Sequence, residues 1–203
     1  MKKAKDLWFN GGLIAILIGV FLVYACSDNK ILNNPSDDQQ TLQDLAAINA
    51  VDLARERLVD TSGLAKPEGD TYLIAKTEFG FEITSSASTA SFMLDGNRIS
   101  IAVPANAFDK SKWGERLYIY IRAEKWNTST GSTVSYYECT PGGVVFNSPL
   151  KITQPYENKV SGKQNLYFKN PISNTWVTAD SQSLLDGQAR FSIDHFSKYA
   201  ISD

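Results

Sequence analysis

Histidine and cysteine are scarce in this sequence: one histidine and two cysteines occur among 203 residues. Ordinary zinc sites draw their ligands largely from these two residue types, so the composition excludes them. Asp180, Asp186 and Asp194 carry the oxygen ligands that calcium prefers, but their spacing matches no known calcium-binding loop. The sequence also lacks a phosphate-binding loop, a nucleophile elbow and a dinucleotide fingerprint. We therefore expect no metal ion and no organic cofactor.

An excess of basic charge is also missing. The chain has 20 lysine and arginine residues against 22 aspartate and glutamate residues, which gives a formal net charge of −2. Proteins bind nucleic acids and anionic lipid head groups largely through clustered lysine and arginine. We therefore expect no nucleic-acid partner and no electrostatic attraction to lipid head groups.

The N-terminus carries an apolar run from Leu13 to Ala25. Lys2, Lys3 and Lys5 precede the run, and Cys26 follows it directly. A bilayer-spanning helix needs about 20 apolar residues, so this run is short for a span and fits the core of a signal peptide. A retained single-pass anchor is the alternative, and either interpretation tethers the rest of the chain to a membrane.

This order of features resembles a bacterial lipoprotein signal peptide. The resemblance implies cleavage before Cys26 and fatty acylation of that residue, palmitate included, so that lipid holds the chain in a bacterial cell envelope. Ser27 stands where an aspartate favours the inner membrane, which implies the outer membrane, with the chain facing either the periplasm or the outside. Cys139 then has no cysteine partner, and we expect it to be a small buried hydrophobic residue.

Composition divides the chain into four parts: a signal peptide (1–25), a polar flexible tether (26–40), a helical segment (41–63) and a β-domain (69–203). The helical segment is rich in helix-forming residues. At helical spacing, four of its apolar residues share one stripe: Leu42, Leu45, Ala46 and Leu53. We expect this short helix to pack against the β-domain or to act as a stalk, with a partner-binding helix as the alternative.

From residue 69 onward, short alternating runs and turn residues predict β-structure. The segment 117–122 alternates strictly, with Leu117, Ile119 and Ile121 on one face. Asp95-Gly96 lies between two such runs and predicts a tight hairpin. Eight or more short strands without intervening helical patterns predict an all-β fold, an antiparallel β-sandwich.

The β-domain also carries a family resemblance, over roughly residues 80–203. Four segments follow the order of motifs in the ZU-type β-sandwich domain of ankyrins, zonula occludens proteins and netrin receptors: Ile99–Phe108, Val145–Ile152, Trp176 and His195–Ile201. Asn106 replaces a glycine of the first motif, and asparagine tolerates the positive φ that such a turn needs. The resemblance implies a sandwich used mostly for protein interaction.

The tripeptide His195-Phe196-Ser197 is the candidate for chemistry. In some ZU-type domains the Phe–Ser bond of this tripeptide breaks by self-cleavage. The resemblance then implies Ser197 as nucleophile, the carbonyl of Phe196 as target and His195 as general base. The alternative is structural: in an unbroken strand, His195 and Ser197 lie on an apolar face and satisfy each other's hydrogen bonds.

A row of polar aromatic residues is the candidate binding surface. Tyr118, Tyr120 and Arg122 lie on the face opposite Leu117, and Trp126 is close in sequence. Such a row stacks on sugar rings or anchors a protein partner. The alternative is cross-strand pairing beneath the helix or a second sheet.

Together these features predict a membrane-tethered, non-enzymatic β-sandwich that acts as a protein-interaction or envelope-structural module. Its membrane contact is the lipid on Cys26, and its partner is an unidentified envelope protein or glycan. Two alternatives stay open: a module that cleaves itself between Phe196 and Ser197, and a surface lipoprotein that binds glycans.

Overall fold

The structure, a computed structural model, describes residues 35–60, 71–156 and 162–202, with the side chains of the N-terminal helix described over 39–56. The unit discussed below is Gln39–Asp203. The predicted signal peptide, Cys26 and the first part of the predicted tether lie outside the described residues. Within the described ranges, no helix has both the length and the apolar character that a membrane crossing requires.

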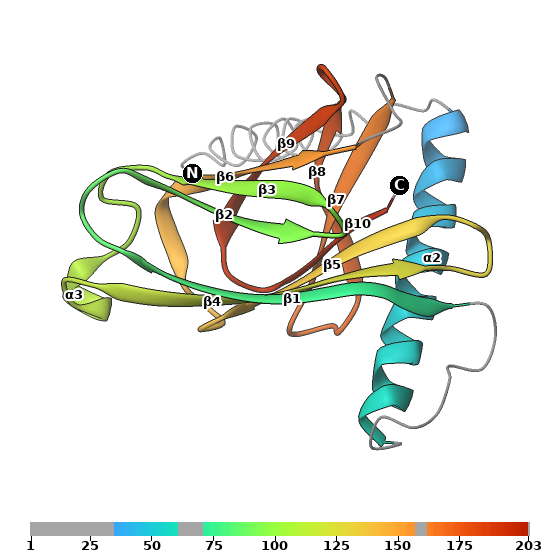
Figure 1. The fold of residues 1–203 in the computed structure, drawn as a ribbon, viewed down its shortest axis with the longest axis horizontal. Coiled ribbons are helices and arrows are strands. Elements are labelled where there is room, and N and C mark those ends of the chain that lie inside the picture. The colour runs from blue at the N-terminus through green and yellow to red at the C-terminus, as the bar shows by residue number, and fades with distance from the viewer. Residues whose placement is uncertain (1–34, 61–70, 157–161, 203) are drawn as a thin grey trace, which may run out of the picture. The chain divides into compact units, whose positions relative to one another are not determined.

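Two antiparallel sheets form the body of the domain, which confirms the predicted all-β sandwich (Figure 1). Sheet A has the order β1 (Tyr72–Ile83), β4 (Leu117–Asn127), β5 (Thr133–Thr140), β10 (Lys198–Ser202), β7 (Lys163–Lys169) and β8 (Trp176–Ser183). Sheet B has the order β2 (Ser88–Leu94), β3 (Asn97–Val103), β6 (Val145–Pro155) and β9 (Gln188–His195). A short helix, α3 (Lys110–Trp113), precedes β4.

The alternation of β4 places its two faces as the sequence predicts. Leu117, Ile119 and Ile121 are buried between the sheets, while Tyr118 and Tyr120 lie on the outer face of sheet A. The inner faces of both sheets form one apolar core. Because side chains alternate along a strand, this burial fixes which residues face outward.

Two turns adopt the backbone conformations that their residues favour. Asp95 (φ 49°) and Gly96 (φ 77°) join β2 to β3, and two successive residues with positive φ are typical of a type I′ hairpin. Asn106 has φ 53°, so the asparagine adopts the left-handed conformation expected of it. The predicted hairpin is therefore confirmed.

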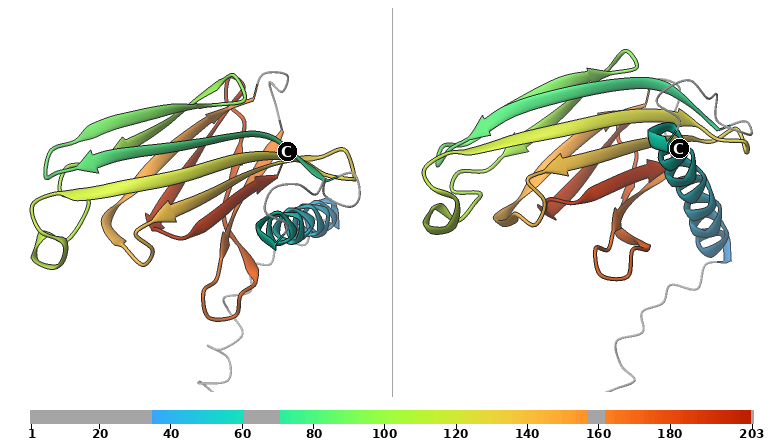
Figure 2. Two further views of the ribbon diagram at one scale, coloured as in Figure 1. Left: turned by 60° about the horizontal axis from the view of Figure 1, so that its bottom comes forward. Right: turned by 90° about the horizontal axis from the view of Figure 1, so that it is seen from below.

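Helix α2 (Pro35–Asp60) lies on the outer face of sheet A, toward one end of the strands (Figure 2). The buried helix residues that pack against the sheet are Ala47, Ile48, Val51 and Ala54. Their buried partners on the sheet are Trp126, Val134, Tyr136, Tyr167, Trp176 and Ala200. The domain therefore has three layers: the helix, sheet A and sheet B.

The structure differs from two expectations about this helix. It begins at Pro35, so residues 35–40, assigned to the tether, are helical. The predicted apolar stripe is wrong, because Leu42 and Leu53 are 68% and 50% exposed. The face that packs on the sheet also carries charged residues, and these find partners that the sequence of the helix alone does not reveal.

One connection between the sheets positions the candidate catalytic tripeptide. β9 ends in sheet B at His195, and β10 begins in sheet A at Lys198. Phe196 and Ser197 therefore form the link by which the chain crosses from one sheet to the other. The unbroken strand expected through this tripeptide is not present.

Candidate functional site

Phe196 is fixed in the sheet-crossing link by both its side chain and its backbone. Its ring is 2% exposed and packs edge-on against Phe146, with 4.8 Å between ring centroids. Its backbone N–H donates to the carbonyl of Val144 (2.7 Å), and its carbonyl accepts from the N–H of Gly143 (3.1 Å). Both backbone groups of Phe196 are thus held by the two residues that precede β6.

Ser197 and His195 have separate hydrogen-bond partners. The Ser197 Oγ donates to the carbonyl of Lys169 (3.2 Å), and the Nδ1 of His195 lies 2.6 Å from Oδ1 of Asp194. The imidazole also stands edge-on to the Phe168 ring, with 5.2 Å between centroids. Among the hydrogen bonds of the described residues, none joins Ser197 to His195.

Neither arrangement expected for the tripeptide is therefore observed. A nucleophile needs its general base within hydrogen-bond reach, and Ser197 instead points to the backbone of β7. The mutual hydrogen bond of a buried His–Ser pair is also absent from the described contacts, because the strand ends at His195 and Ser197 turns toward the other sheet.

A cleft of about 580 Å³ lies beside this link. It is bordered by the link itself, by the loop after β5 and by the loop after β7, with Thr140, Gly142, Asn170, Pro171 and Lys198 among its walls. Cys139 also borders it but is buried, as expected, and burial raises the pKa of its thiol to about 12. Since the thiolate is the reactive form, this cysteine is a packing residue and not a nucleophile.

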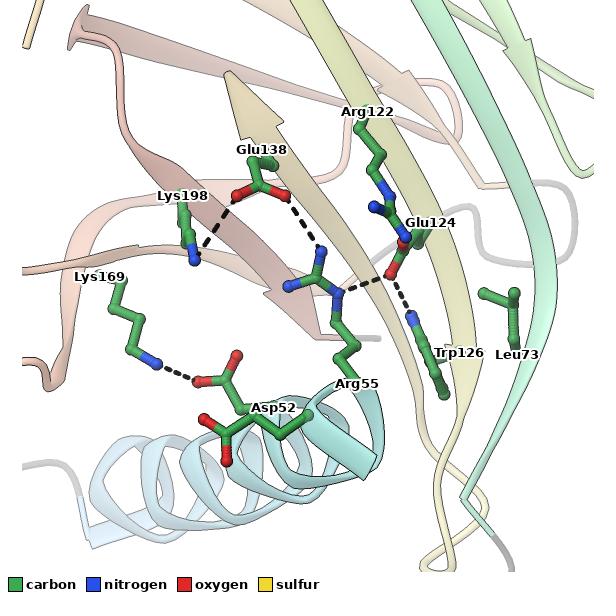
Figure 3. A pocket seen from close by; sticks show the side chains of 10 residues that line it. Asp52, Arg55, Leu73, Arg122, Glu124, Trp126, Glu138, Lys169 and Lys198 are labelled. Atoms are coloured by element: carbon green, nitrogen blue, oxygen red, sulfur yellow. Dashed lines mark hydrogen bonds and ion pairs between the residues drawn. The ribbon is translucent and has the colours of Figure 1, made fainter. Parts of the chain in front are cut away.

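A partly buried ionic network joins helix α2 to the outer face of sheet A (Figure 3). The Arg55 guanidinium lies between two carboxylates, with its Nε 2.7 Å from Oε2 of Glu124 and its Nη2 3.2 Å from Oε2 of Glu138. Glu124 also accepts from the Trp126 indole (2.9 Å) and pairs with Arg122 (2.7 Å). The side chain of Glu124 is only 2% exposed, so its charge depends on these partners.

A carboxylate of α2, Asp52, extends the network. Asp52 pairs with Lys169 (Oδ2 to Nζ, 2.6 Å) and accepts from the Trp176 indole (2.9 Å). Glu138 pairs in turn with Lys198 at 3.5 Å. The residues of the network line a second cleft, of about 340 Å³, whose walls carry both acidic and basic groups. Lys169 therefore contacts both the helix and the tripeptide: its side chain pairs with Asp52, and its backbone carbonyl accepts a hydrogen bond from Ser197.

The network shifts the pKa values of its members. Burial acts to raise the pKa of Glu124, but Arg55, the Trp126 hydrogen bond and Arg122 outweigh it and hold that pKa below its usual range. Burial also raises the pKa of Tyr136, whose ring lies 3.9 Å beneath the Arg55 guanidinium carbon. Glu124 is therefore ionised and Tyr136 neutral at neutral pH.

No protein-family model matches this chain, and no curated protein matches it either. The candidate sites therefore stand on their own geometry. In the part of the chain that the structure describes, no three histidine, cysteine, aspartate or glutamate side chains gather in a way that could hold a metal ion.

The predicted aromatic row divides into two parts. Tyr118 and Tyr120 are 64% and 37% exposed and lie on the part of sheet A that α2 leaves uncovered. Trp126 is only 1% exposed because it packs beneath α2, so its assignment to an exposed binding row is corrected. Arg122 is half-buried and turned toward Glu124. The exposed candidate surface is thus the pair of tyrosines.

The ionic network could not be predicted from motifs in the sequence, because its members lie far apart in the chain. One signal was present on the helix: Asp44, Asp52 and Arg55 share a face with Ile48 and Val51 at helical spacing. Asp44 accepts hydrogen bonds from Asn165 (3.1 Å) and Tyr167 (2.9 Å). Charged residues inside an apolar stripe thus indicated a polar docking surface.

Proposed function

We propose that this chain is a lipid-anchored, non-enzymatic β-sandwich that acts as a binding module of a bacterial cell envelope. The observation that carries the proposal is the uncovered end of sheet A, where Tyr118 and Tyr120 are exposed. At the other end of the sheet, α2 covers the aromatic residues. The N-terminal lipoprotein pattern supports the anchor. The resemblance to ZU-type domains supports a role in binding rather than catalysis.

The contacts of the tripeptide support a non-enzymatic role. Phe196 fills the core, and Ser197 bonds to the backbone of β7 instead of to His195. The Gly143 N–H does point at the Phe196 carbonyl, as a donor that stabilises an oxyanion would. One donor without a base beside the nucleophile does not complete a self-cleaving site.

The docked helix has a fixed position on sheet A. Arg55 and Asp52 of α2 pair the helix with sheet A. Buried ion pairs require specific geometry, so they favour one docked arrangement over sliding of the helix. We infer that the binding face keeps a constant relation to α2.

Replacing Cys26 with serine tests the anchor. We expect the Cys26→Ser protein to lose both labelling by radioactive palmitate in cells and cleavage before residue 26, because serine cannot take the thioether-linked lipid that precedes cleavage. Cys139→Ser is the matched control and keeps both properties, since Cys139 is buried in the domain. Equal mass and no palmitate labelling in both the parent and the Cys26→Ser protein would instead support a single-pass anchor.

Site-specific photo-crosslinking tests the binding face. We expect p-benzoylphenylalanine at position 118 to form high-mass adducts in living cells under ultraviolet light, because this side chain is exposed at the proposed contact. The control position is Met93, which is 49% exposed but belongs to sheet B. Identical adducts from both positions, or none from 118, would count against sheet A as the binding face.

A further inference from the structure

The ring of Tyr118 lies across the backbone of an edge strand. A Cβ atom added to Gly80 would fall 2.1 Å from the Tyr118 hydroxyl oxygen and 2.8 Å from Cζ. In the register of β1 and β4, Tyr118 pairs with Glu82, so its side chain reaches diagonally to Gly80. The absence of a side chain at Gly80 is what permits this contact. Since Tyr118 is 64% exposed, its ring leaves much of its surface open to solvent.

Tyr120 leans in the same diagonal direction. It pairs with Gly80 in the register, and its hydroxyl donates to Glu78, two residues further along β1. Cα atoms of residues two apart on a strand are about 6.6 to 7 Å apart, so the tyrosines form adjacent platforms. The hydroxyl end of Tyr118 lies over Gly80, and that of Tyr120 is held by its hydrogen bond to Glu78.

The charged groups around the tyrosines are paired with one another. Glu78 pairs with Lys76 (3.1 Å), and Glu82 pairs with Arg116 (3.3 Å). The surface therefore offers little net attraction to a strongly charged ligand. It still presents exposed carboxylate and guanidinium groups, which accept from and donate to hydroxyl groups.

The surroundings of the tyrosines fit a sugar better than a protein. The core of a protein interface is depleted in charged residues, whereas these rings are flanked by charged side chains on both β1 and β4. Exposed aliphatic residues lie elsewhere: Leu73 is near α2, and Met93 and Val145 are on sheet B. Aromatic rings surrounded by hydrogen-bonding groups complement a pyranose, which has apolar C–H faces and polar edges.

We propose that Tyr118 and Tyr120 bind a neutral polysaccharide of pyranose units. Axial C–H groups of the sugar rings stack on the tyrosine faces, whose π-electrons carry negative charge. Glu78, Glu82 and Arg116 hydrogen-bond the equatorial hydroxyls. This inference rests on the proposed function and gives that function a ligand class.

Retention on insoluble polysaccharides tests the inference. The full-length protein, purified in detergent, is incubated with cellulose, insoluble xylan or chitin, and the bound fraction is measured. We expect retention on at least one of them and a roughly fivefold to tenfold loss of affinity in Tyr118→Ala, as the loss of one aromatic contact implies. Tyr118→Phe retains binding, because the ring face and not the hydroxyl carries the contact.

Two further variants separate binding from folding. Gly80→Ala forces the Tyr118 ring off the strand, so it weakens retention although no contacting side chain is removed. Tyr72→Ala removes a tyrosine that is 47% exposed on the same strand but lies outside the platform, and retention stays unchanged. Matching thermal melting temperatures of the variants show that each is folded.

Three results would overturn the sugar-binding inference: no retention on any of the three polysaccharides, equal losses in Tyr72→Ala and Tyr118→Ala, or binding confined to purified peptidoglycan sacculi, which are charged. Protein adducts from position 118 in cells, combined with no polysaccharide retention, would assign the face to a protein partner. That combination overturns the sugar and leaves the proposed binding face standing.

Discussion

Arg55→Ala is expected to lower the free energy of unfolding by about 3 kcal/mol, the lower end of the range for breaking a buried ion pair. The side chains of Arg55 and Glu124 are 14% and 2% exposed, so removal of the guanidinium leaves a carboxylate in a poorly hydrated site. Glu124 keeps Arg122 and the Trp126 indole as partners, which moderates the loss. The substitution also removes the cation above the Tyr136 ring.

Urea unfolding followed by tryptophan fluorescence measures this effect. Trp126 and Trp176 donate to Glu124 and Asp52, so their emission reports on the helix–sheet contact itself. Arg55→Met keeps the aliphatic packing and removes the charge, which separates the two contributions. Lys76→Ala is the matched control, because the Lys76–Glu78 pair is exposed, and we expect no measurable change there. Equal stability of Arg55→Ala and Lys76→Ala would show that the network does not hold the helix.

The strands of the sandwich were the most predictable part of this molecule. Strict alternation at 117–122 assigns Leu117, Ile119 and Ile121 to the core without any knowledge of the partner strands. Asp95-Gly96 similarly specifies its own turn through backbone conformation. Both signals are local, so they can be recognised within a few residues of sequence.

The face of α2 that docks was not predictable by counting apolar residues. Leu42 and Leu53 are larger than the alanines of the buried face, yet they remain exposed. Arg55 on the docked face pairs with two carboxylates that lie 69 and 83 residues away in the sequence. Tertiary pairing of this kind overrides a weak amphipathic pattern, and the same docking buries Trp126.

The tripeptide 195–197 could likewise be predicted only in part from the sequence. Its residues are visible in the sequence, but their geometry depends on where β9 ends. Because the chain changes sheets at Phe196, the two-residue periodicity that would place His195 and Ser197 on one face is interrupted. A strand break between two sheets leaves no local signal comparable to a glycine or proline turn.

Phe196→Ala is expected to destabilise the domain by about 3 to 5 kcal/mol, whereas Ser197→Ala lowers its stability by under about 1 kcal/mol. Phe196 is buried against Phe146 where the chain crosses between the sheets, so truncation leaves a cavity in the shared core. Ser197 contributes one neutral hydrogen bond to the Lys169 carbonyl and is only half-buried. Urea unfolding of the two variants measures both values under the same conditions.

Intact mass under denaturing conditions distinguishes this structural role from self-cleavage. We expect the chain from Ser27 to Asp203 and its Ser197→Ala variant each to give a single uncleaved mass, because the Ser197 hydroxyl is committed to Lys169 and lacks a described bond to His195. Loss of the segment 197–203 from the parent, abolished in Ser197→Ala, would establish cleavage and make His195 a general base. Large destabilisation at Phe196 with unbroken masses would instead show that the chain keeps the tripeptide for packing the sheet crossing, where an aromatic ring must fill the core between β6 and β10.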